Sequence, residues 1–346
     1  MKISVSSDRL EVFTSLIFET AGLQRSLAEQ WSRILVWANL RGVDSHGVMR
    51  VPRYVQLITK NAINTRPQFE LITDAAAVAV IECDRAPGGP AMLKAVHEAV
   101  SRAQQYGIGW CTAKNISHAG AIGYFALEAT KAGMAAIVMS ASGQPLMAYH
   151  GSRVSGVSTN PIAIGFPSKK RAPLLLDMST SNVSFGKLLN ARKLGAEVPN
   201  DWGVSHTGGE TTDPNHIAAL RPLGGPKGSG LSLMIECLTS IAVSNPLLAH
   251  SLSGDADTDK PVLNGAVIAI SPEVLGDVDQ MEVDLQALGK SITELPKAEG
   301  IRNIFLPGER GNLIMSQHMR DGISIPTQVV DQLNDTAERL GISERL

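Results

Sequence analysis

The chain has 346 residues, 44% of them apolar and 18% charged, which is long enough for two or three domains and for a cleft between them. Its 31 basic and 33 acidic residues leave a formal net charge of −2, which argues against nucleic acid as the main partner. Aromatic residues make up only 4% of the chain, so few side chains could stack on nucleic-acid bases. A small polar ligand is therefore a better expectation than a nucleic acid.

Three widely spaced cysteines indicate a reducing compartment. Cys83, Cys111 and Cys237 form no CxxC pair, which argues against a disulfide framework and a cysteine-rich zinc module. The eight histidines are scattered, so no metal site is expected. Asp8 and Arg9 interrupt any apolar core of a signal peptide, and no apolar run is long enough to span a bilayer. We therefore expect a cytoplasmic protein that binds no membrane.

Residues 1–74 are predicted to form a helical segment that carries a polar loop. Two helices fill the first forty residues, and a capping box of Ser26 and Glu29 starts the second. A third helix begins near Pro52, with Tyr54 among its inward-facing positions. The two last helices are joined by Gly42-Val-Asp-Ser-His-Gly-Val-Met-Arg50. Polar chemistry is thus concentrated on one short interhelical connection.

Residues 75–222 are predicted to form an α/β domain, because short β-branched runs alternate with helical segments. This alternation alone is compatible with a parallel, doubly wound sheet. The glycine fingerprint GxGxxG, which usually opens such a dinucleotide-binding domain, is absent from the chain. The expected strands are 78–81, 108–112, 135–139, 162–166 and 174–176, and the expected helices are 91–106, 124–131 and 186–194.

Residues 223–346 are predicted to form a glycine-rich loop and a helical region that packs with the N-terminal segment. The loop is Gly224-Gly-Pro-Lys-Gly-Ser-Gly230. A later polar stretch contains Asp255, Asp257 and Asp259, but it lacks the glycine and the closing glutamate of a calcium loop, so we expect it to be solvated. The expected elements are an apolar helix over 231–243, a polar loop over 251–260, a strand over 266–270, and helical segments over 304–310 and from Pro326 onwards.

Three corners of the predicted fold favour an anionic ligand. Ser117-His-Ala-Gly-Ala-Ile-Gly123 lies between a strand and a helix, where backbone N–H groups and the helix dipole favour negative charge. Lys227 adds a fixed positive charge to a similar helix start. Asp177 lies at the end of a buried strand, a position suited to ribose hydroxyls or phosphate oxygens. Each corner alone is more often a tight connection or a helix cap, but together they suit a ligand with separated phosphates.

Six longer motifs follow one another along almost the whole chain. They are Arg41-Gly-Val-Asp-Ser-His-Gly-Val-Met-Arg-Val-Pro-Arg-Tyr54, Ser117-His-Ala-Gly-Ala-Ile-Gly-Tyr124, Ser158-Thr-Asn-Pro-Ile-Ala163, Leu176-Asp-Met-Ser-Thr180, Pro222-Leu-Gly-Gly-Pro-Lys-Gly-Ser-Gly230 and Leu306-Pro-Gly-Glu-Arg310. Together they resemble the type 2 malate/L-lactate dehydrogenase family. Any one motif is weak evidence, but the six are jointly specific.

The resemblance implies an NAD(P)-dependent oxidoreductase with a non-Rossmann α/β fold, in which a mixed or largely antiparallel sheet is flanked by helical segments from both chain ends. It also implies a homodimer and a small substrate with a carboxylate beside the reacting carbon. Family members act on malate, lactate, sulfolactate, ureidoglycolate, diketogulonate or cyclic imino acids. We therefore expect hydride transfer between a nicotinamide cofactor and a small 2-hydroxy acid or 2-oxo acid.

The same resemblance assigns roles to individual residues. The catalytic Ser-His pair of the family falls on Ser45 and His46, the arginine that binds the substrate carboxylate falls on Arg50, and Thr159 matches a substrate contact of imine-reducing members. His46 matches the proton donor of the imine-reducing branch and His118 the base of the ureidoglycolate branch, so the choice between them is open. The positions that match cofactor contacts are His118, Ala119, Gly120, Ala121, Ile122, Ser140, Asp177, Met178, Ser179, Lys227, Gly308 and Arg310.

Other functions stay open beside this hypothesis. Cyclic imine reduction is disfavoured, because the chain has Lys187 where those reductases carry a carboxylate in a relay position. An inactive relative that binds a dinucleotide as a sensor, or a non-redox enzyme acting on a phosphorylated metabolite, would use the same anion-binding corners. The stretch from Gly186 to Gly228 looks most like the ureidoglycolate branch, which favours NAD over NADP.

Overall fold

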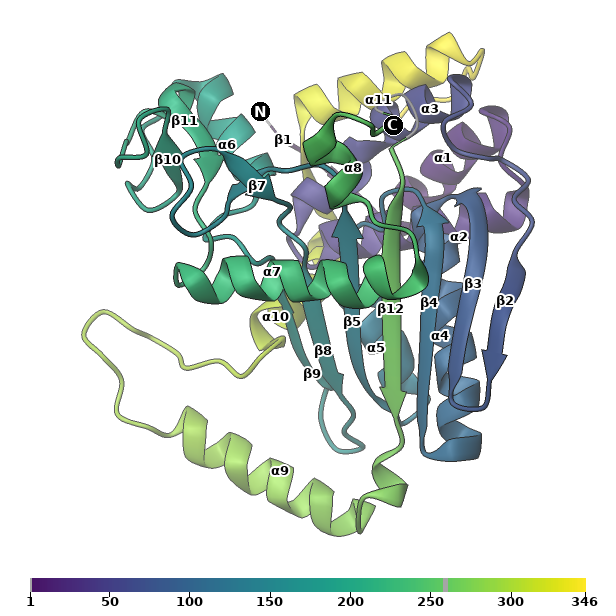
Figure 1. Cartoon of the computed structure of the whole chain (residues 1–346), viewed down its shortest axis with the longest axis vertical. Helices are drawn as coiled ribbons and strands as arrows, with labels where there is room; N and C mark the ends of the chain where they lie inside the picture. Colours follow the sequence, from purple (N-terminus) through teal and green to yellow (C-terminus); the bar gives the residue numbers. More distant parts are fainter. Residues whose placement is uncertain (1, 258–260) are drawn as a thin grey trace.

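The computed structural model describes residues 2–257 and 261–346, and its centre is a seven-stranded sheet (Figure 1). The strand order is β2-β3-β4-β12-β5-β8-β9. Only β3 and β4 are parallel, and all other neighbours are antiparallel. The expected mixed, largely antiparallel sheet is therefore confirmed, and a parallel doubly wound sheet is excluded. Its strands are β2 (Glu70–Ala75), β3 (Val78–Ala86), β4 (Ile108–Ile116), β5 (Ala135–Ser142), β8 (Ile162–Phe166), β9 (Leu174–Met178) and β12 (Leu263–Ile270).

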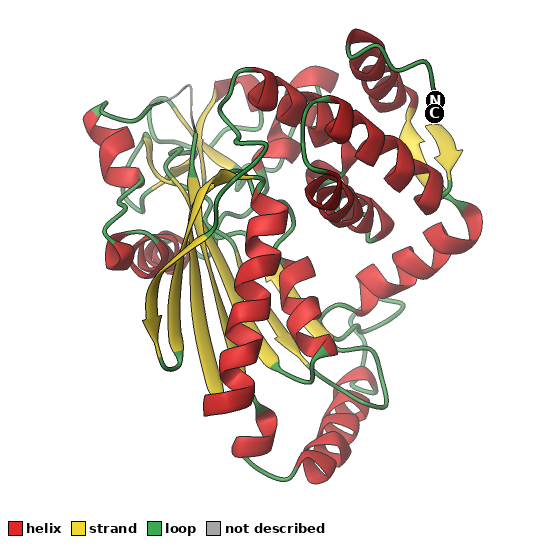
Figure 2. Ribbon diagram, turned by 90° about the vertical axis from the view of Figure 1, so that its right-hand side faces the viewer, coloured by secondary structure: helices red, strands yellow, loops and turns green. Residues whose placement is uncertain are grey.

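Two helices, α4 (Gly88–Tyr106) and α5 (Gly123–Lys131), cover one face of this sheet (Figure 2). Alternate strand residues such as Cys111 and Val138 meet Met92 and Phe125 of these helices in one buried core. On the other face, α7 (Pro226–Thr239) crosses only the upper part of the sheet (Figure 1). The lower part of that face is left uncovered by the described helices.

The two ends of the chain share a second core beside the sheet. Strand β1 (Lys2–Val5) pairs with β13 (Ile323–Pro326) in an antiparallel ribbon. Phe18, Trp31 and Leu333 lie in the core that forms beneath it. Helical segments from both ends thus flank the α/β domain, as expected. The helices are α1 (Ser7–Thr20), α2 (Arg25–Leu40), α3 (Val51–Thr59), α10 (Glu309–Asp321) and α11 (Thr327–Arg339).

A small four-stranded sheet forms a third body at one end of the large sheet (Figure 1). Met147, Leu188 and Leu220 are among the buried residues of its own core. The strand order is β10-β11-β6-β7. Its elements are β6 (Met147–Ala148), β7 (Ser155–Val157), α6 (Phe185–Leu194), β10 (Gly203–Ser205) and β11 (Ile217–Leu220).

Helix α9 (Val278–Thr293) lies below the large sheet and was not expected from the sequence (Figure 1). Buried Glu282 anchors it, because its carboxylate accepts hydrogen bonds from the Ser168 hydroxyl at 2.8 Å and the Lys169 backbone N–H at 2.9 Å. The short helix α8 (Leu248–Ser253) precedes β12. Among the described residues, no helix is long and apolar enough to cross a membrane.

Several expectations about local structure were wrong. Helix α2 begins at Arg25 with Gln24 as its N-cap, so Ser26 does not cap it, and Glu29 instead pairs with Arg25 at 2.8 Å. The predicted helix over 304–310 is irregular up to Gly308, whose φ of 90° starts α10 one residue later. The expected polar loop over 251–260 begins inside α8, and its Asp259 lies outside the described residues.

The division into 1–74, 75–222 and 223–346 stays a prediction. The central sheet takes β12 from the last of these stretches and inserts it between β4 and β5. The cofactor domain proposed from the sequence is thus completed by a strand from outside its predicted range.

Candidate active site

The loop between α2 and α3 is built from two short 3-10 turns, over Asp44–His46 and Val48–Arg50. Asn39, near the end of α2, holds both: its amide donates to the Asp44 carboxylate at 2.7 Å and its oxygen accepts the Val48 N–H at 2.8 Å. A Cβ on Gly47 would lie 2.1 Å from that oxygen, so only glycine fits between the turns. The loop is therefore held rigidly against α2.

This loop carries three of the predicted site residues. The Ser45 hydroxyl and His46 Nδ1 are hydrogen-bonded at 2.9 Å, and Arg50 Nε donates to the Ser45 carbonyl at 2.7 Å. All three side chains are half-buried. Within the described part of the chain, the two terminal nitrogens of the Arg50 guanidinium make no hydrogen bond, so they are available to a ligand.

His118 lies next to this loop in space, although it is far from it in sequence. It follows β4, and its ring stacks on that of His46 with centroids 5.6 Å apart and planes 23° apart. Its Nδ1 is 2.6 Å from the hydroxyl of Tyr54 on α3. Gly88, at the start of α4, packs so closely against the Ser117–His118 backbone that a Cβ there would lie 2.2 Å from the Ser117 carbonyl oxygen. Two predicted candidates far apart in sequence thus form one pair.

The environment keeps both imidazoles neutral. Desolvation, together with the charge of Arg50, lowers the pKa of His46 to about 4. Desolvation, His46 and Arg50 lower the pKa of His118 well below its ordinary value. Desolvation also raises the pKa of the Tyr54 phenol, which therefore keeps its proton. Near neutral pH the cluster offers two uncharged imidazoles beside one fixed guanidinium.

Asp177, at the end of β9, lies beside the loop that contains His118. Its carboxylate accepts the Gly123 N–H at 3.0 Å and so caps the start of α5. Although Asp177 reaches solvent, desolvation raises the pKa of its carboxyl to about 6, against the opposing effects of the Gly123 N–H and Arg41. The segment Ala119–Ile122 between them is buried. Two of the predicted anion-binding corners therefore meet at one strand end.

The third corner adjoins the same strand end. The Thr180 carbonyl accepts the Leu223 N–H at 2.9 Å, and a Cβ on Gly228 would lie 2.3 Å from that carbonyl oxygen. The Thr180 hydroxyl is buried and bonds to none of the residues that the structure describes. Lys227, in the first turn of α7, is exposed and its ammonium makes no ion pair among the described residues.

The turn at 307–310 also lies against β9. Leu175 N–H donates to the Pro307 carbonyl at 3.1 Å, and the carbonyl of Gly308 accepts a hydrogen bond from buried Arg41 at 3.0 Å. Arg310 is exposed. The predicted contacts at Gly308 and Arg310 are thus next to the strand that carries Asp177.

Four remaining residues were predicted to contact the substrate or the cofactor, and in the structure none of them adds a charged group to the site. Ser140 is buried, and its hydroxyl donates to the Asn264 carbonyl at 3.1 Å, so that group is already occupied by the neighbouring strand β12. Thr159 is half-buried in the connection from β7 to β8. Met178 is half-buried, and the Ser179 hydroxyl bonds to Ser181 at 3.1 Å.

Sequence reasoning missed two residues of the site. Tyr54 was assigned only to the core, yet its hydroxyl touches His118. Arg41 is 7% exposed, and its guanidinium lies 5.3 Å from the Trp37 ring and bonds to Asn312 and Gly308. A signal for Arg41 was its position at the start of the first motif. Neither the motif nor periodicity could reveal the Tyr54 contact, because its partner lies 64 residues away.

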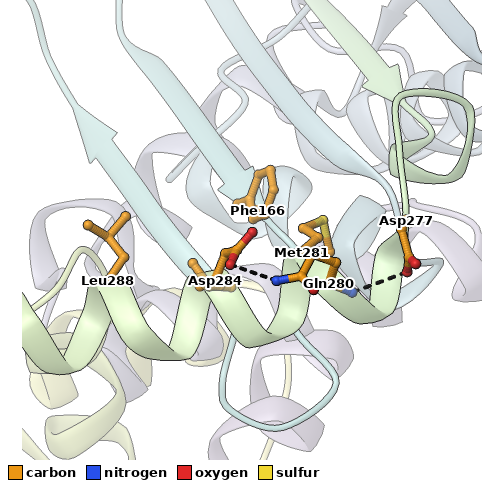
Figure 3. Close-up of a pocket in the computed structure, with 7 residues that line it drawn as sticks. Phe166, Asp277, Gln280, Met281, Asp284 and Leu288 are labelled. Atoms are coloured by element: carbon orange, nitrogen blue, oxygen red, sulfur yellow. Dashed lines mark hydrogen bonds between the residues drawn. The ribbon is translucent and has the colours of Figure 1, made fainter.

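A cavity of about 560 Å³ lies elsewhere, between the end of β8 and α9 (Figure 3). Its apolar wall is formed by Phe166, Met281, Leu285 and Leu288. Its polar groups are paired with each other: Asp277 caps α9 by accepting the Gln280 N–H at 3.1 Å, and the Gln280 amide donates to Asp284 at 2.9 Å. Both carboxylates of the lining therefore already accept hydrogen bonds within α9. Among the described residues no cluster of three or more His, Cys, Asp or Glu could hold a metal ion.

Comparison with known proteins gives one consistent result. A family model described as malate/L-lactate dehydrogenase matches residues 5–334. The chain is 33% identical over 350 residues to the malate dehydrogenase of Pyrococcus horikoshii, covering 98% of this chain and 96% of that protein. It is 30% identical over 315 residues to the ureidoglycolate dehydrogenase (NAD(+)) of Escherichia coli, covering 90% of each.

Solved structures show the same relationship. The Pyrococcus horikoshii malate dehydrogenase structure superposes with a TM-score of 0.89 and 31% identity, over 100% of this chain and 97% of that one. The delta1-piperideine-2-carboxylate reductase of Pseudomonas syringae shares the fold, with a TM-score of 0.84 and 24% identity, over 97% of this chain and 100% of that one.

Proposed function

Because the chain belongs to the malate/L-lactate dehydrogenase family, and is therefore a nicotinamide-dependent oxidoreductase of small 2-hydroxy acids, we propose that the His46–His118 pair and Arg50 form its active site. One observation carries this proposal: two stacked, neutral imidazoles lie beside a guanidinium whose terminal nitrogens bond to none of the described residues. A proton-transfer group and a carboxylate-binding group are what oxidation of a 2-hydroxy acid requires.

In the proposed mechanism Arg50 binds the substrate carboxylate. Its Nε is held by the Ser45 carbonyl, so the two terminal nitrogens can form a fork with both carboxylate oxygens. The fork orients the hydroxyl-bearing carbon and fixes which face is presented. Ser45 also bonds to His46, so one residue positions both the carboxylate-binding group and one ring of the pair.

We assign proton transfer to His118. In oxidation its neutral ring takes the hydroxyl proton of the substrate, and in reduction it returns that proton to the oxygen. The bound nicotinamide supplies the acceptor or donor of the hydride. His46, stacked on His118, packs against the ring that gains charge. The similarity to a ureidoglycolate dehydrogenase supports this choice, since the resemblance of the sequence motifs to that branch assigns the base to His118.

The residues around the end of β9 fit a dinucleotide. Lys227 in the first turn of α7 provides an exposed ammonium for phosphate oxygens, and the glycines at 123 and 228 pack too closely against the end of β9 for any side chain. Asp177 supplies a carboxylate for hydroxyl groups, and Met178, Ser179, Gly308 and Arg310 adjoin it. We propose NAD rather than NADP, since the ureidoglycolate dehydrogenase relative is named for NAD(+).

If Asp177 accepts hydrogen bonds from the cofactor as a carboxylate, binding should weaken as the pH falls through its pKa of about 6. Protonation removes an acceptor, so the Kd for NADH is expected to be about tenfold higher at pH 5 than at pH 7. His46, with a pKa of about 4, stays neutral over this range. Fluorescence titration of NADH at each pH gives the Kd. Asp177→Asn should bind more weakly but without this pH dependence, and a flat profile in the unmodified protein would contradict the assignment.

A reductase of cyclic imino acids is the second candidate, supported by the shared fold of the piperideine-2-carboxylate reductase. Lys187 argues against it. It lies on α6, next to Gly186, where a Cβ would be 3.2 Å from the Ser45 Cβ. A lysine at this position cannot act as the carboxylate relay that we associate with imine reduction.

We also propose that the chain forms a homodimer through the uncovered sheet face. Six apolar residues lie directly opposite one another across that face, namely Val78, Trp110, Ile268, Ile137, Ile164 and Leu176. Val78, Ile164 and Leu176 are each about 40% exposed, at 42%, 39% and 40%. A continuous apolar row of this kind is typical of a surface that a partner covers, and a second copy can cover it by two-fold symmetry.

Sedimentation equilibrium should therefore give twice the 36.7 kDa mass of one chain. Ile164→Lys places a charge in the row and is expected to weaken the dimer at least tenfold. Val12→Lys, at a residue that is 69% exposed on α1, is the matched control and should leave the mass unchanged. A wild-type protein with the mass of one chain would refute the dimer.

The three free cysteines support the proposal of a reducing, cytoplasmic location. Cys83 and Cys111 are buried in the sheet core, where their thiols pack as apolar groups.

The experiment that tests the function is a panel of substrates. Purified protein is followed at the nicotinamide absorbance with NADH or NADPH and 2-oxo acids or a cyclic imino acid, and in reverse with ureidoglycolate, malate, lactate and sulfolactate. Turnover of a 2-hydroxy acid with NAD is expected. Turnover of the imino acid alone would favour the second candidate, and binding without turnover would favour a sensor.

A further inference from the structure

Arg41, which directly follows α2, is a buried cation that forms no ion pair with the residues that the structure describes. It is 7% exposed, and its guanidinium donates hydrogen bonds to the Gly308 carbonyl at 3.0 Å and to the side-chain oxygen of Asn312. An arginine keeps its charge in a protein interior, and a buried charge without a carboxylate at contact distance costs stability. A cation that is held by neutral oxygens therefore points to a role beyond packing.

Both partners of Arg41 belong to the start of α10, so the guanidinium fixes the turn at 307–310. Gly308 has a φ of 90°, and its carbonyl also accepts the Asn312 N–H at 3.0 Å, which closes the first turn of the helix. Gly311 leaves the space that the guanidinium fills, because a Cβ there would lie 2.5 Å from Arg41 Nη2. The turn, which also bonds to β9, is thus held between β9 and the end of α2.

The end of α2 holds both halves of the proposed site. Asn39 fixes the loop that carries Arg50. Arg41, two residues later, fixes the turn at 307–310. The Trp37 ring, one helical turn earlier and 5.3 Å from the Arg41 guanidinium, limits the movement of that guanidinium. The substrate loop and the cofactor turn are therefore held by neighbouring residues of one helix end.

We propose that Arg41 is a positioning residue for the cofactor, which holds the turn at 307–310 against β9 and acts on Asp177 through its charge. The inference rests on the proposed function, in which Asp177, Gly308 and Arg310 contact the dinucleotide. Arg41 itself is buried and its donors are engaged by the turn, so it acts through these residues.

The charge of Arg41 favours the ionised form of Asp177. Desolvation raises the pKa of this carboxyl, whereas the Gly123 N–H at the start of α5 and the charge of Arg41 both lower it. Strand β8, beside β9, has no ionisable side chain, and of the turn residues Glu309 is paired with an arginine and Arg310 is exposed. Loss of the Arg41 charge should therefore make Asp177 a weaker acceptor for cofactor hydroxyls near neutral pH.

Arg41→Lys keeps the charge but replaces the planar fork, which reaches two oxygens, with a single ammonium. We expect the Kd for NADH to rise about fivefold to tenfold, because a buried oxygen loses its partner. The kcat, and the KM for the 2-hydroxy acid at saturating NAD, should change less than about twofold. Arg102→Lys is the matched control, since Arg102 is 8% exposed, bonds to the Ala76 carbonyl and lies near the end of α4 that is far from His118. An unchanged Kd in Arg41→Lys, or equal increases in both variants, would overturn the proposal.

Arg41→Met removes the charge as well, and the pH profile of NADH binding then separates a role in positioning from a loss of packing. Without the nearby cation Asp177 should take up its proton at higher pH. We expect the Kd of Arg41→Met to be about twofold higher at pH 7 than at pH 8, whereas the wild type and Arg41→Lys should show almost the same Kd at both. Identical profiles in the methionine and lysine variants would refute the role of the charge.

Hydrogen exchange of the protein without cofactor tests the turn directly. The Leu175 N–H donates to the Pro307 carbonyl and the Asn312 N–H to the Gly308 carbonyl, so both amides report on the turn. In Arg41→Lys both should exchange about tenfold faster, and in Arg102→Lys at the wild-type rate. Unchanged exchange in Arg41→Lys would overturn the inference. Because this measurement needs no nicotinamide, a wild-type protein that fails to bind NADH would count against the proposed function alone.

Discussion

Replacement of His118 by glutamine is expected to lower kcat by about 10²- to 10⁴-fold, the usual loss when a positioned proton-transfer group is removed. Glutamine keeps a polar group near Tyr54 but cannot take up a proton, so the stacked core should remain folded. The measurement is steady-state oxidation of the best 2-hydroxy acid of the panel, with kcat and KM determined separately. The KM for the substrate should change little, because Arg50 still binds the carboxylate.

Two further variants make this result specific to His118. His46→Gln removes the neighbouring ring, which lies 5.6 Å away, and is expected to cost less in kcat than His118→Gln. His97→Gln is the matched control, because His97 is exposed on α4 and outside the site. If His46→Gln abolished turnover and His118→Gln did not, His46 would be the proton-transfer residue, and the assignment of that role to His118 would be wrong.

The secondary structure was predictable where the periodic pattern was strong. Strands β3, β4, β5 and β8 follow from β-branched runs, and α4 follows from its apolar stripe and the glycine at its end. Helix α9 was missed although its sequence has a helical apolar period, Val278, Met281, Leu285, Leu288 and Ile292, and in the structure only Glu282, Leu285 and Gly289 of its 16 residues are buried. The small sheet was missed because its strands have only two to four residues each.

Topology was harder to predict than the elements. Strand β12 pairs with β4 and β5, whose residues precede it by more than 100 positions, and local sequence carries no signal for such a pairing. The antiparallel order came only from the family resemblance. Alternation of strands and helices is equally compatible with a parallel sheet, and the absence of GxGxxG was the single local argument against one.

The candidate site was predicted in parts. The motifs contained Ser45, His46, Arg50 and His118, and the fold brings these four together. The geometry of the site could not be predicted from the sequence, because it depends on contacts between distant segments. These contacts are the stacking of the two histidine rings, the bond of His118 to Tyr54, and the convergence of three anion-binding corners at the end of β9. Tyr54 was recognised as an inward-facing residue, but burial alone does not distinguish a core phenol from one that orients a catalytic ring.

Replacement of Arg50, whose two terminal nitrogens are proposed to bind the substrate carboxylate, is expected to have the second large effect on activity. Arg50→Lys keeps a positive charge but replaces two parallel donors with a single ammonium, and it also loses the bond from Nε to the Ser45 carbonyl. We expect kcat/KM for the 2-hydroxy acid to fall about 10- to 100-fold, equivalent to the loss of one charge-assisted hydrogen bond and of orientation. Arg50→Met, which removes the charge as well, should lose about a further tenfold.

Arg53→Lys is the matched control for this substitution. Arg53 lies three residues further along, is exposed, and bonds only to Gln56 at 2.6 Å among the described residues. It should keep the kcat/KM of the wild type. The two lysine variants also separate substrate binding from cofactor binding: if Arg50 holds the substrate carboxylate, Arg50→Lys leaves the Kd for NADH unchanged. An unchanged kcat/KM in Arg50→Lys would show that the carboxylate is bound elsewhere, and an increased Kd for NADH would place Arg50 on the cofactor.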